Sequence, residues 1–247
     1  MPDRDRDLAS QPNEADGFLP GAQGPGNASL TTLEHNLRMA ETDISGYRFD
    51  DAACNCAHDY LLTTIEGVLR EIDPQPRRAF DLGCGNGSVA DWLRKKGYAV
   101  AGVDPSTSGI AEANRAYPDL DLRVGSAYDP LHETFGRYPL VVSLEVVEHV
   151  YAPRDFARCV RDLLEPGGHA LISTPYHGYL KNLLLALTGG MDRHFTALWD
   201  HGHIKFWSPA TITQLLGEVG LSVLRVHRVG RLAPLAKSML VVARRDS

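Results

Sequence analysis

A glycine-rich segment stands at 81–87: Asp81-Leu82-Gly83-Cys84-Gly85-Asn86-Gly87. It directly follows a short apolar run, and its alternate glycines let the backbone turn sharply and approach a ligand closely. Loops that bind dinucleotides have the spacing G-x-G-x-x-G and place a diphosphate at the start of the following helix. This loop has G-x-G-x-G, and Asp81 stands before its first glycine, where a carboxylate would repel a diphosphate. The segment therefore predicts a ligand-binding turn between a strand and a helix, for a ligand without phosphate at that place.

Strands and helices alternate on both sides of this loop. Short apolar runs predict strands at 78–82, 98–103, 120–124, 140–144, 169–173, 222–229 and 238–243. Helical periodicity and end signals predict helices at 51–72, 89–96, 105–117, 153–164, 179–187 and 209–219. The last two strands are joined by too few residues for a parallel crossover, so they should be antiparallel. We predict a Rossmann-like α/β fold, with a mostly parallel seven-stranded sheet, one late antiparallel strand and helices on both faces.

A second acid, Asp104, ends the predicted strand after the loop and lies 21 residues beyond Gly83. A carboxylate there can accept hydrogen bonds from both hydroxyls of a ribose. Asp81 suits an ammonium group, so the two acids fit S-adenosylmethionine (SAM), which has a ribose and an amino-acid end but no phosphate. The loop and its acids resemble class I SAM-dependent methyltransferases over a region from about residue 51 to the C-terminus. A NAD site and a plain tight turn are the alternatives.

The resemblance implies further contacts with the cofactor. In that family the residues at 124–127 flank the adenine, usually with an acid, and here Ser126 takes the place of the acid. Leu144, at the end of the fourth strand, would line the cofactor. The implied cofactor-binding residues are Asp81, Gly83, Cys84, Gly85, Gly87, Asp104, Pro105, Ser126, Ala127 and Leu144.

Two acids and a histidine follow the fourth strand: Glu145, Glu148 and His149. If the chain turns helically after Glu145, these side chains converge, because positions i and i+3 share a helix face. Two interpretations are open. The group can bind a divalent metal, since oxygen ligands favour magnesium or manganese and an imidazole admits iron or zinc. Alternatively, the acids stabilise a helix start and His149 only packs or meets solvent.

The spacing Glu145-x-x-Glu148-His149 is similar to the E-x-x-E-H segment of the ubiquinone-biosynthesis O-methyltransferase family, where it is associated with magnesium. Small-RNA 2′-O-methyltransferases carry a like segment together with a histidine from a late loop. This resemblance implies His203 as a fourth ligand, with His201 as its rival, and magnesium as the metal. Four of the 10 histidines fall in the stretch that follows the fifth strand: His177, His194, His201 and His203.

These features predict an enzyme that methylates a hydroxyl of a small molecule with help from a metal. A catechol, a sugar diol or a prenylated or acylated metabolite would suit it. The catalytic candidates are His149, His177 and His194, of which His177 or His194 would take the proton. An insertion at about 175–210 would cover the substrate, and its apolar part at 179–187 is either a buried helix or a wall that also touches a membrane surface. An RNA 2′-O-methyltransferase and a SAM-binding protein without catalysis are the alternatives.

Composition limits the remaining choices. The 247 residues are 43% hydrophobic and 23% charged, which is typical of one globular domain. Residues 1–29 are rich in Pro, Gly, Asp and Asn and predict a disordered tail, which leaves the domain at 30–247. The net charge of −6 disfavours a general nucleic-acid partner. No apolar run is long enough to span a membrane, and four cysteines without framework spacing indicate reduced thiols in the cytoplasm.

Overall fold

The computed structural model describes residues 56–195, 197–199 and 202–247. The predicted tail at 1–29 and the first part of the predicted domain, 30–55, lie outside the described residues, and so does His201. None of the helices in the described residues has both the length and the apolar character needed to cross a membrane.

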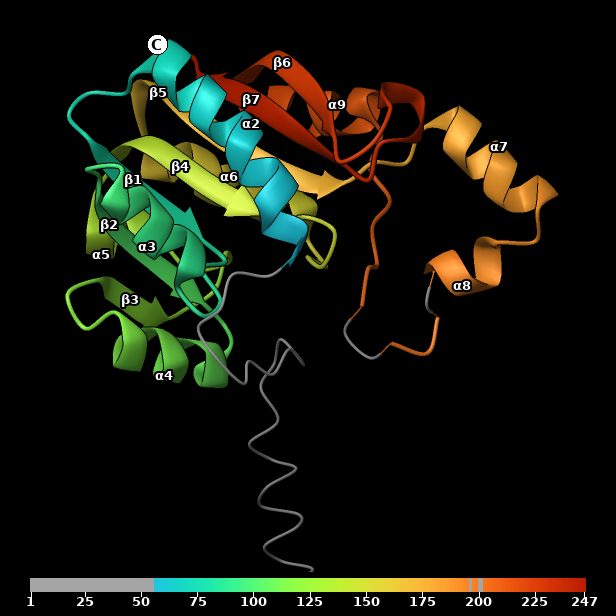
Figure 1. Ribbon diagram of the computed structural model, residues 1–247. Coiled ribbons are helices and arrows are strands. Elements are labelled where there is room, and N and C mark those ends of the chain that lie inside the picture. The colour runs from blue at the N-terminus through green and yellow to red at the C-terminus, as the bar shows by residue number, and fades with distance from the viewer. Residues whose placement is uncertain (1–55, 196, 200–201) are drawn as a thin grey trace, which may run out of the picture. The chain divides into compact units, whose positions relative to one another are not determined.

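Within the described residues, seven strands form one sheet in the order β3-β2-β1-β4-β5-β7-β6 (Figure 1). Strand β7 runs antiparallel to both β5 and β6, while the pairs among β1 to β5 are parallel. The predicted sheet and its late antiparallel strand are confirmed. The strands are β1 Arg78–Leu82, β2 Ala99–Asp104, β3 Asp121–Val124, β4 Tyr138–Leu144, β5 Leu164–Pro175, β6 Leu221–Val229 and β7 Ser238–Arg245.

Helices cover both faces of the sheet (Figure 1). One apolar core lies under α2 (Cys56–Ile72), α3 (Ser88–Lys95) and α4 (Thr107–Ala116). The other lies under α5 (Leu131–Phe135), α6 (Pro153–Leu163) and α9 (Pro209–Gly217). Strand β4 is buried along its whole length because its side chains alternate between the two cores: Leu140 and Val142 enter the first and Val141 the second.

The remaining helices lie on the side of the sheet toward which the arrowheads of β4 and β5 point (Figure 1). They are α7 (Tyr179–Leu187) and α8 (Met191–Phe195), and a short 3₁₀ turn, η1 (Ala233–Leu235), joins β6 to β7. In parallel sheets, ligands bind outside the carboxyl ends of the strands. The chain therefore places the glycine loop, the acids after β4 and the predicted insertion around one edge of the sheet.

Two local differences from the prediction have simple causes. The short elements α5, α8 and η1 were not predicted, because five or fewer residues carry no readable periodicity. Strand β5 begins at Leu164 rather than at residue 169, because Pro166, Gly167 and Gly168 form an irregularity within the strand instead of a loop before it. Neither difference moves a predicted site residue.

Candidate functional site

The glycine loop has the backbone that only glycine adopts without strain. Gly83, Gly85 and Gly87 have φ angles of +86°, +51° and +77°. The loop is fastened to β2, because the N–H groups of Gly83 and Cys84 both donate to the carbonyl of Val103, at 2.8 and 3.0 Å. This arrangement turns the chain sharply out of β1.

Asp81 lies at the bottom of this turn. Its side chain is buried, and its Oδ2 atom has no hydrogen-bond partner among the described residues. Burial, and then the charge of Asp104, raise the pKa of Asp81 to about 7. A buried acceptor without a partner is costly unless a ligand supplies a donor. An ammonium group is such a donor, so the site fits the amino-acid end of SAM.

Asp104 stands where β2 ends, next to the loop. Its carboxylate accepts the N–H of Gly85 at 2.8 Å and the N–H of Ser106 at 2.8 Å. Ser106 in turn caps α4 by accepting the N–H of Gly109, so Pro105 precedes the helix rather than beginning it. A carboxylate at this place can accept hydrogen bonds from the hydroxyls of a ribose.

The predicted adenine segment begins just after β3. The N–H of Gly125 donates to the carbonyl of Asp104, and Ser126 donates its N–H to Asp129 at 2.7 Å. A pocket of about 280 Å³ lies beside this segment and is lined in part by Val103, Gly125 and Asp129. Ala127 packs against the core of the α5, α6 and α9 face, and Leu144 is buried at the end of β4. Sequence reasoning missed Asp129, an acid three residues after Ser126.

We expect Gly83→Ala to lower the free energy of unfolding by about 2–4 kcal/mol, as measured by urea denaturation. A Cβ at this position would lie 2.3 Å from Cγ2 of Val146, and the φ angle is left-handed. Gly67→Ala is the matched control. Gly67 lies on α2, where an added Cβ would meet no other atom within 4 Å, so this variant should gain up to about 1 kcal/mol. Equal stability of the two variants would contradict this role for Gly83.

Glu145 has an unusual backbone for a residue with a side chain, a φ angle of +56°. Its N–H donates to the Ser173 hydroxyl at 3.0 Å, and that hydroxyl donates to its Oε1 at 2.8 Å. Burial raises the pKa of Glu145, and the hydroxyls of Ser173 and Ser238 oppose this rise. Because the left-handed residue breaks a helical run, the turn that would align Glu145 with Glu148 does not form.

Glu148, His149 and His203 do converge. One ligand atom from each lies within 4.8 Å of the others. Oε1 of Glu148 is 4.0 Å from Nε2 of His149 and 3.9 Å from Nε2 of His203. The Glu148 side chain is fully buried, and neither carboxylate oxygen has a partner at normal hydrogen-bond distance among the described residues. The Thr174 hydroxyl lies near enough to favour the charged form of this carboxyl. Burial, and then the charge of Glu145, raise the pKa of Glu148 well above its ordinary range.

Backbone hydrogen bonds hold His203 beside Glu148. The N–H groups of Ile204 and Lys205 both donate to the carbonyl of Glu148, at 2.9 and 3.0 Å. The indole N–H of Trp207 donates to the carbonyl of Val147 at 3.1 Å. These bonds hold the segment with His203 against the turn after β4. The predicted convergence of His203 with Glu148 and His149 is therefore present, while Glu145 lies outside the group.

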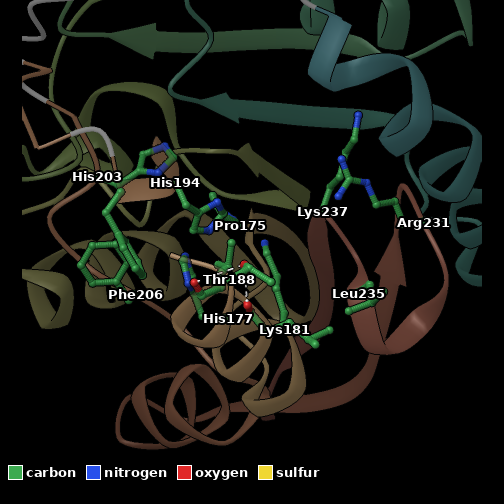
Figure 2. A pocket seen from close by; sticks show the side chains of 13 residues that line it. Pro175, His177, Lys181, Thr188, His194, His203, Phe206, Arg231, Leu235 and Lys237 are labelled. Carbon is green, nitrogen blue, oxygen red and sulfur yellow. Dashed lines mark hydrogen bonds between the residues drawn. The ribbon is translucent and has the colours of Figure 1, made fainter. Parts of the chain in front are cut away.

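A pocket of about 360 Å³ opens beside His203 (Figure 2). Its walls come from α7, α8, the segment 203–206 and the connection between β6 and β7. His177 and His194 line it, with ring centroids 5.8 Å apart. The pKa of His177 is lowered to about 4 by burial and then by Lys181, and the pKa of His203 is lowered to about 4 by burial and then by His149. Both rings are therefore neutral at pH 7, as metal ligands and proton acceptors must be.

The sheet with its antiparallel β7, the left-handed glycine loop and the two acids beside it define a class I SAM-dependent methyltransferase. Comparison with known families agrees with this class. The chain belongs to the methyltransferase domain family, whose profile matches residues 57–226.

Curated relatives are also methyltransferases, and a solved structure shares the fold. The chain is 33% identical over 172 residues to the human mitochondrial ubiquinone biosynthesis O-methyltransferase, covering 67% of this chain and 47% of that protein. It is 30% identical over 175 residues to the ubiquinone biosynthesis O-methyltransferase of Marinobacter nauticus, covering 67% of this chain and 72% of that protein. The chain thus spans about half of the human relative. The magnesium protoporphyrin IX methyltransferase of Synechocystis PCC 6803, solved with bound S-adenosylhomocysteine (SAH), shares the fold, with a TM-score of 0.60 at 18% identity over 86% of this chain and 100% of that one.

Proposed function

We propose that this methyltransferase transfers the methyl group of SAM to a hydroxyl of a small molecule, with help from a divalent metal. The observation that carries the proposal is the buried carboxylate of Glu148, which accepts no hydrogen bond among the described residues and lies close to the imidazoles of His149 and His203. His203 also lines a pocket. The relatives named O-methyltransferases support the same reaction.

The described residues fit a metal. Glu148, His149 and His203 would hold it, because two imidazole nitrogens and one carboxylate already lie close together and the carboxylate lacks other partners. Nitrogen donors bind manganese, cobalt or zinc more readily than magnesium, so the predicted magnesium has to be tested beside them. Glu145 lies outside this group, and its Oε1 accepts the hydroxyl of Ser173, so it would join as a further ligand only if its side chain moved.

Each part of the site has its own role in the proposed reaction. Asp81, the glycine loop and Asp104 hold SAM, which supplies a methyl group on a sulfonium centre. We call Glu148, His149 and His203 together the Glu148 group. A divalent metal held by this group would lower the pKa of a substrate hydroxyl and orient it. His177 or His194 accepts the proton, since both line the pocket. Helices α7 and α8 cover the acceptor and keep it in line with the methyl group.

The acceptor has an apolar part in this proposal. On α7, Tyr179, Leu180, Leu183 and Leu187 are exposed, so this helix is not the buried helix that one interpretation predicted. We propose that this face receives an apolar tail of the acceptor or touches a membrane surface, and turnover that depends on detergent micelles would support either contact. The cytoplasm remains the proposed location. An RNA acceptor is the second candidate, which the net charge of −6 disfavours.

The test is an acceptor screen with protein freed of metal by chelation. We expect methyl transfer from SAM to a catechol to fall at least about 10-fold on chelation and to return with manganese, cobalt or magnesium. The matched measurement is SAH binding by titration calorimetry, which should not change with metal. Equal turnover with and without metal would contradict the proposed role of the metal in methyl transfer. SAH binding without transfer to catechols, sugars or short RNA would favour a binding protein without catalysis.

A further inference from the structure

The pocket beside His203 has a second, cationic end. Lys181 on α7, together with Arg231 and Lys237 on the connection between β6 and β7, lines it, and no Asp or Glu is among its lining residues (Figure 2). The whole chain carries 25 basic and 31 acidic residues. The charged lining residues of this pocket are therefore basic, although the protein as a whole has more acidic than basic residues.

These cations have no carboxylate within ion-pair distance in the described part of the chain, although the charge of Glu145 attracts Lys181 from farther away. None of the three makes an ion pair with a described carboxylate. Nζ of Lys181 donates to the carbonyl of Tyr176 at 3.0 Å, and Nζ of Lys237 lies 5.4 Å from the ring centre of Tyr60. Burial and then the charge of Arg231 lower the pKa of Lys181, so these two cations repel each other. An anion between them would relieve this repulsion.

The two ends of the pocket are separated. Figure 2 shows His203 and His194 on one side of the view and Arg231 and Lys237 on the other, with the Lys181 side chain between them. Apolar side chains of Leu184, Leu185, Phe206 and Leu235 line the space as well. A ligand that fills it needs a reactive group at the imidazole end, an apolar body and a negative charge at the far end.

We infer that the acceptor carries an anionic group, such as a carboxylate, which Arg231, Lys237 and Lys181 bind while its hydroxyl faces the Glu148 group. This inference rests on the proposed function and adds the charge of the substrate to it. A membrane of anionic lipid fits less well. The exposed outer residues of α7 are uncharged, whereas Lys181 of the same helix lines the pocket. The cations therefore serve a ligand inside the pocket rather than a surface outside it.

A charge series of catechols tests the inference. Dihydrocaffeate, its primary amide and dopamine carry a carboxylate, a neutral group and an ammonium on similar short arms. For the wild-type protein loaded with metal and SAM, we expect KM to be at least about 10-fold lower for dihydrocaffeate than for the amide, and highest for dopamine. The KM for dihydrocaffeate alone should rise as salt is added.

The double variant Arg231→Met and Lys237→Met should lose this preference in KM with little change in kcat. Arg225→Met is the control, because Arg225 is exposed on β6 and pairs with Glu71 away from the pocket. Equal KM values for the acid and the amide in the wild type would overturn the inference and leave O-methylation standing. If none of the three is methylated, calorimetry on the SAH-loaded protein decides. Binding of dihydrocaffeate that the double variant loses supports the anion site although the proposed reaction fails, and equal binding by both proteins overturns it.

Discussion

Replacement of Asp81 by asparagine should weaken SAM binding at pH 8 by at least about 100-fold, as measured by titration calorimetry. The loss follows because the carboxylate is fully buried, and removal of one partner from a buried charge pair costs about 3–5 kcal/mol. The wild-type protein should also bind SAM more weakly as the pH falls below about 7, because Asp81 takes up a proton there. The asparagine variant should lack this dependence, since the ammonium of SAM stays protonated over that range.

The stability of the protein without ligand should change in the opposite direction. The folded-state pKa of Asp81, about 7, lies above its ordinary value of 3.8, so the folded state binds the proton more tightly. Stability is therefore lost as the pH rises from about 4 to 7, and the loss is complete above 7. Asp81→Asn removes this cost. Above pH 7 the variant should be more stable than the wild type by about 2–4 kcal/mol in urea denaturation, and the difference should vanish near pH 4.

Asp155→Asn is the control for both measurements. Asp155 is exposed on α6 and pairs with Arg158, away from the glycine loop. It should change neither SAM affinity nor the pH dependence of stability. If Asp81→Asn bound SAM as tightly as Asp155→Asn, the ammonium would lie elsewhere, and the buried carboxylate would be only a part of the turn.

The cofactor loop could be predicted because its signal is local. Gly83, Gly85 and Gly87 follow one strand directly, and Asp104 ends the next, so the order of elements alone brings them to one edge of a parallel sheet. The hydrogen bond from Gly85 to Asp104 joins neighbouring strands that any βαβ unit would pair. Residues within such a unit have few alternative positions.

The neighbourhood of Glu148 was predictable only in part. The spacing singled out His149, and the family resemblance implied His203. The side that His203 faces depends on hydrogen bonds from Ile204 and Lys205 to the carbonyl of Glu148. The position of Glu145 depends on its left-handed backbone and on Ser173, which is 28 residues away in the chain. The i, i+3 spacing on a helix cannot predict a hydrogen bond to a hydroxyl on the neighbouring strand.

The cationic end of the pocket had no signal in the sequence. Lys181 lies in an apolar stretch whose sequence predicts a buried helix or an apolar wall of the substrate site. Arg231 and Lys237 lie in the short connection before β7. They meet only because β7 inserts between β5 and β6, which returns this connection to the edge that α7 covers. Because the order of strands in the sheet brings these three cations together, neither a run of charges nor a regular spacing in the sequence predicts their cluster.

Replacement of Glu148 by glutamine should lower methyl transfer at saturating SAM by at least about 100-fold. The reason is that Glu148 is the carboxylate of the group it forms with His149 and His203. Manganese at about 100 times its Kd should stabilise the wild-type protein by about 2.7 kcal/mol, which raises its Tm by about 5–10 °C. The variant should show less than about 1 °C of this rise, while its affinity for SAM stays within about 2-fold of the wild type, because the glycine loop is untouched.

Two further variants separate the ligands from their neighbours. Glu133→Gln, an exposed acid on α5, should keep turnover and the full rise in Tm. Glu145→Gln should keep most of the rise, because its side chain can still bond to Ser173. If Glu145→Gln abolishes the rise as completely as Glu148→Gln, then Glu145 turns away from Ser173 to become a ligand, as the resemblance implies. If Glu148→Gln keeps both the rise and the turnover, no metal acts at this group and the imidazoles beside it serve only the acceptor.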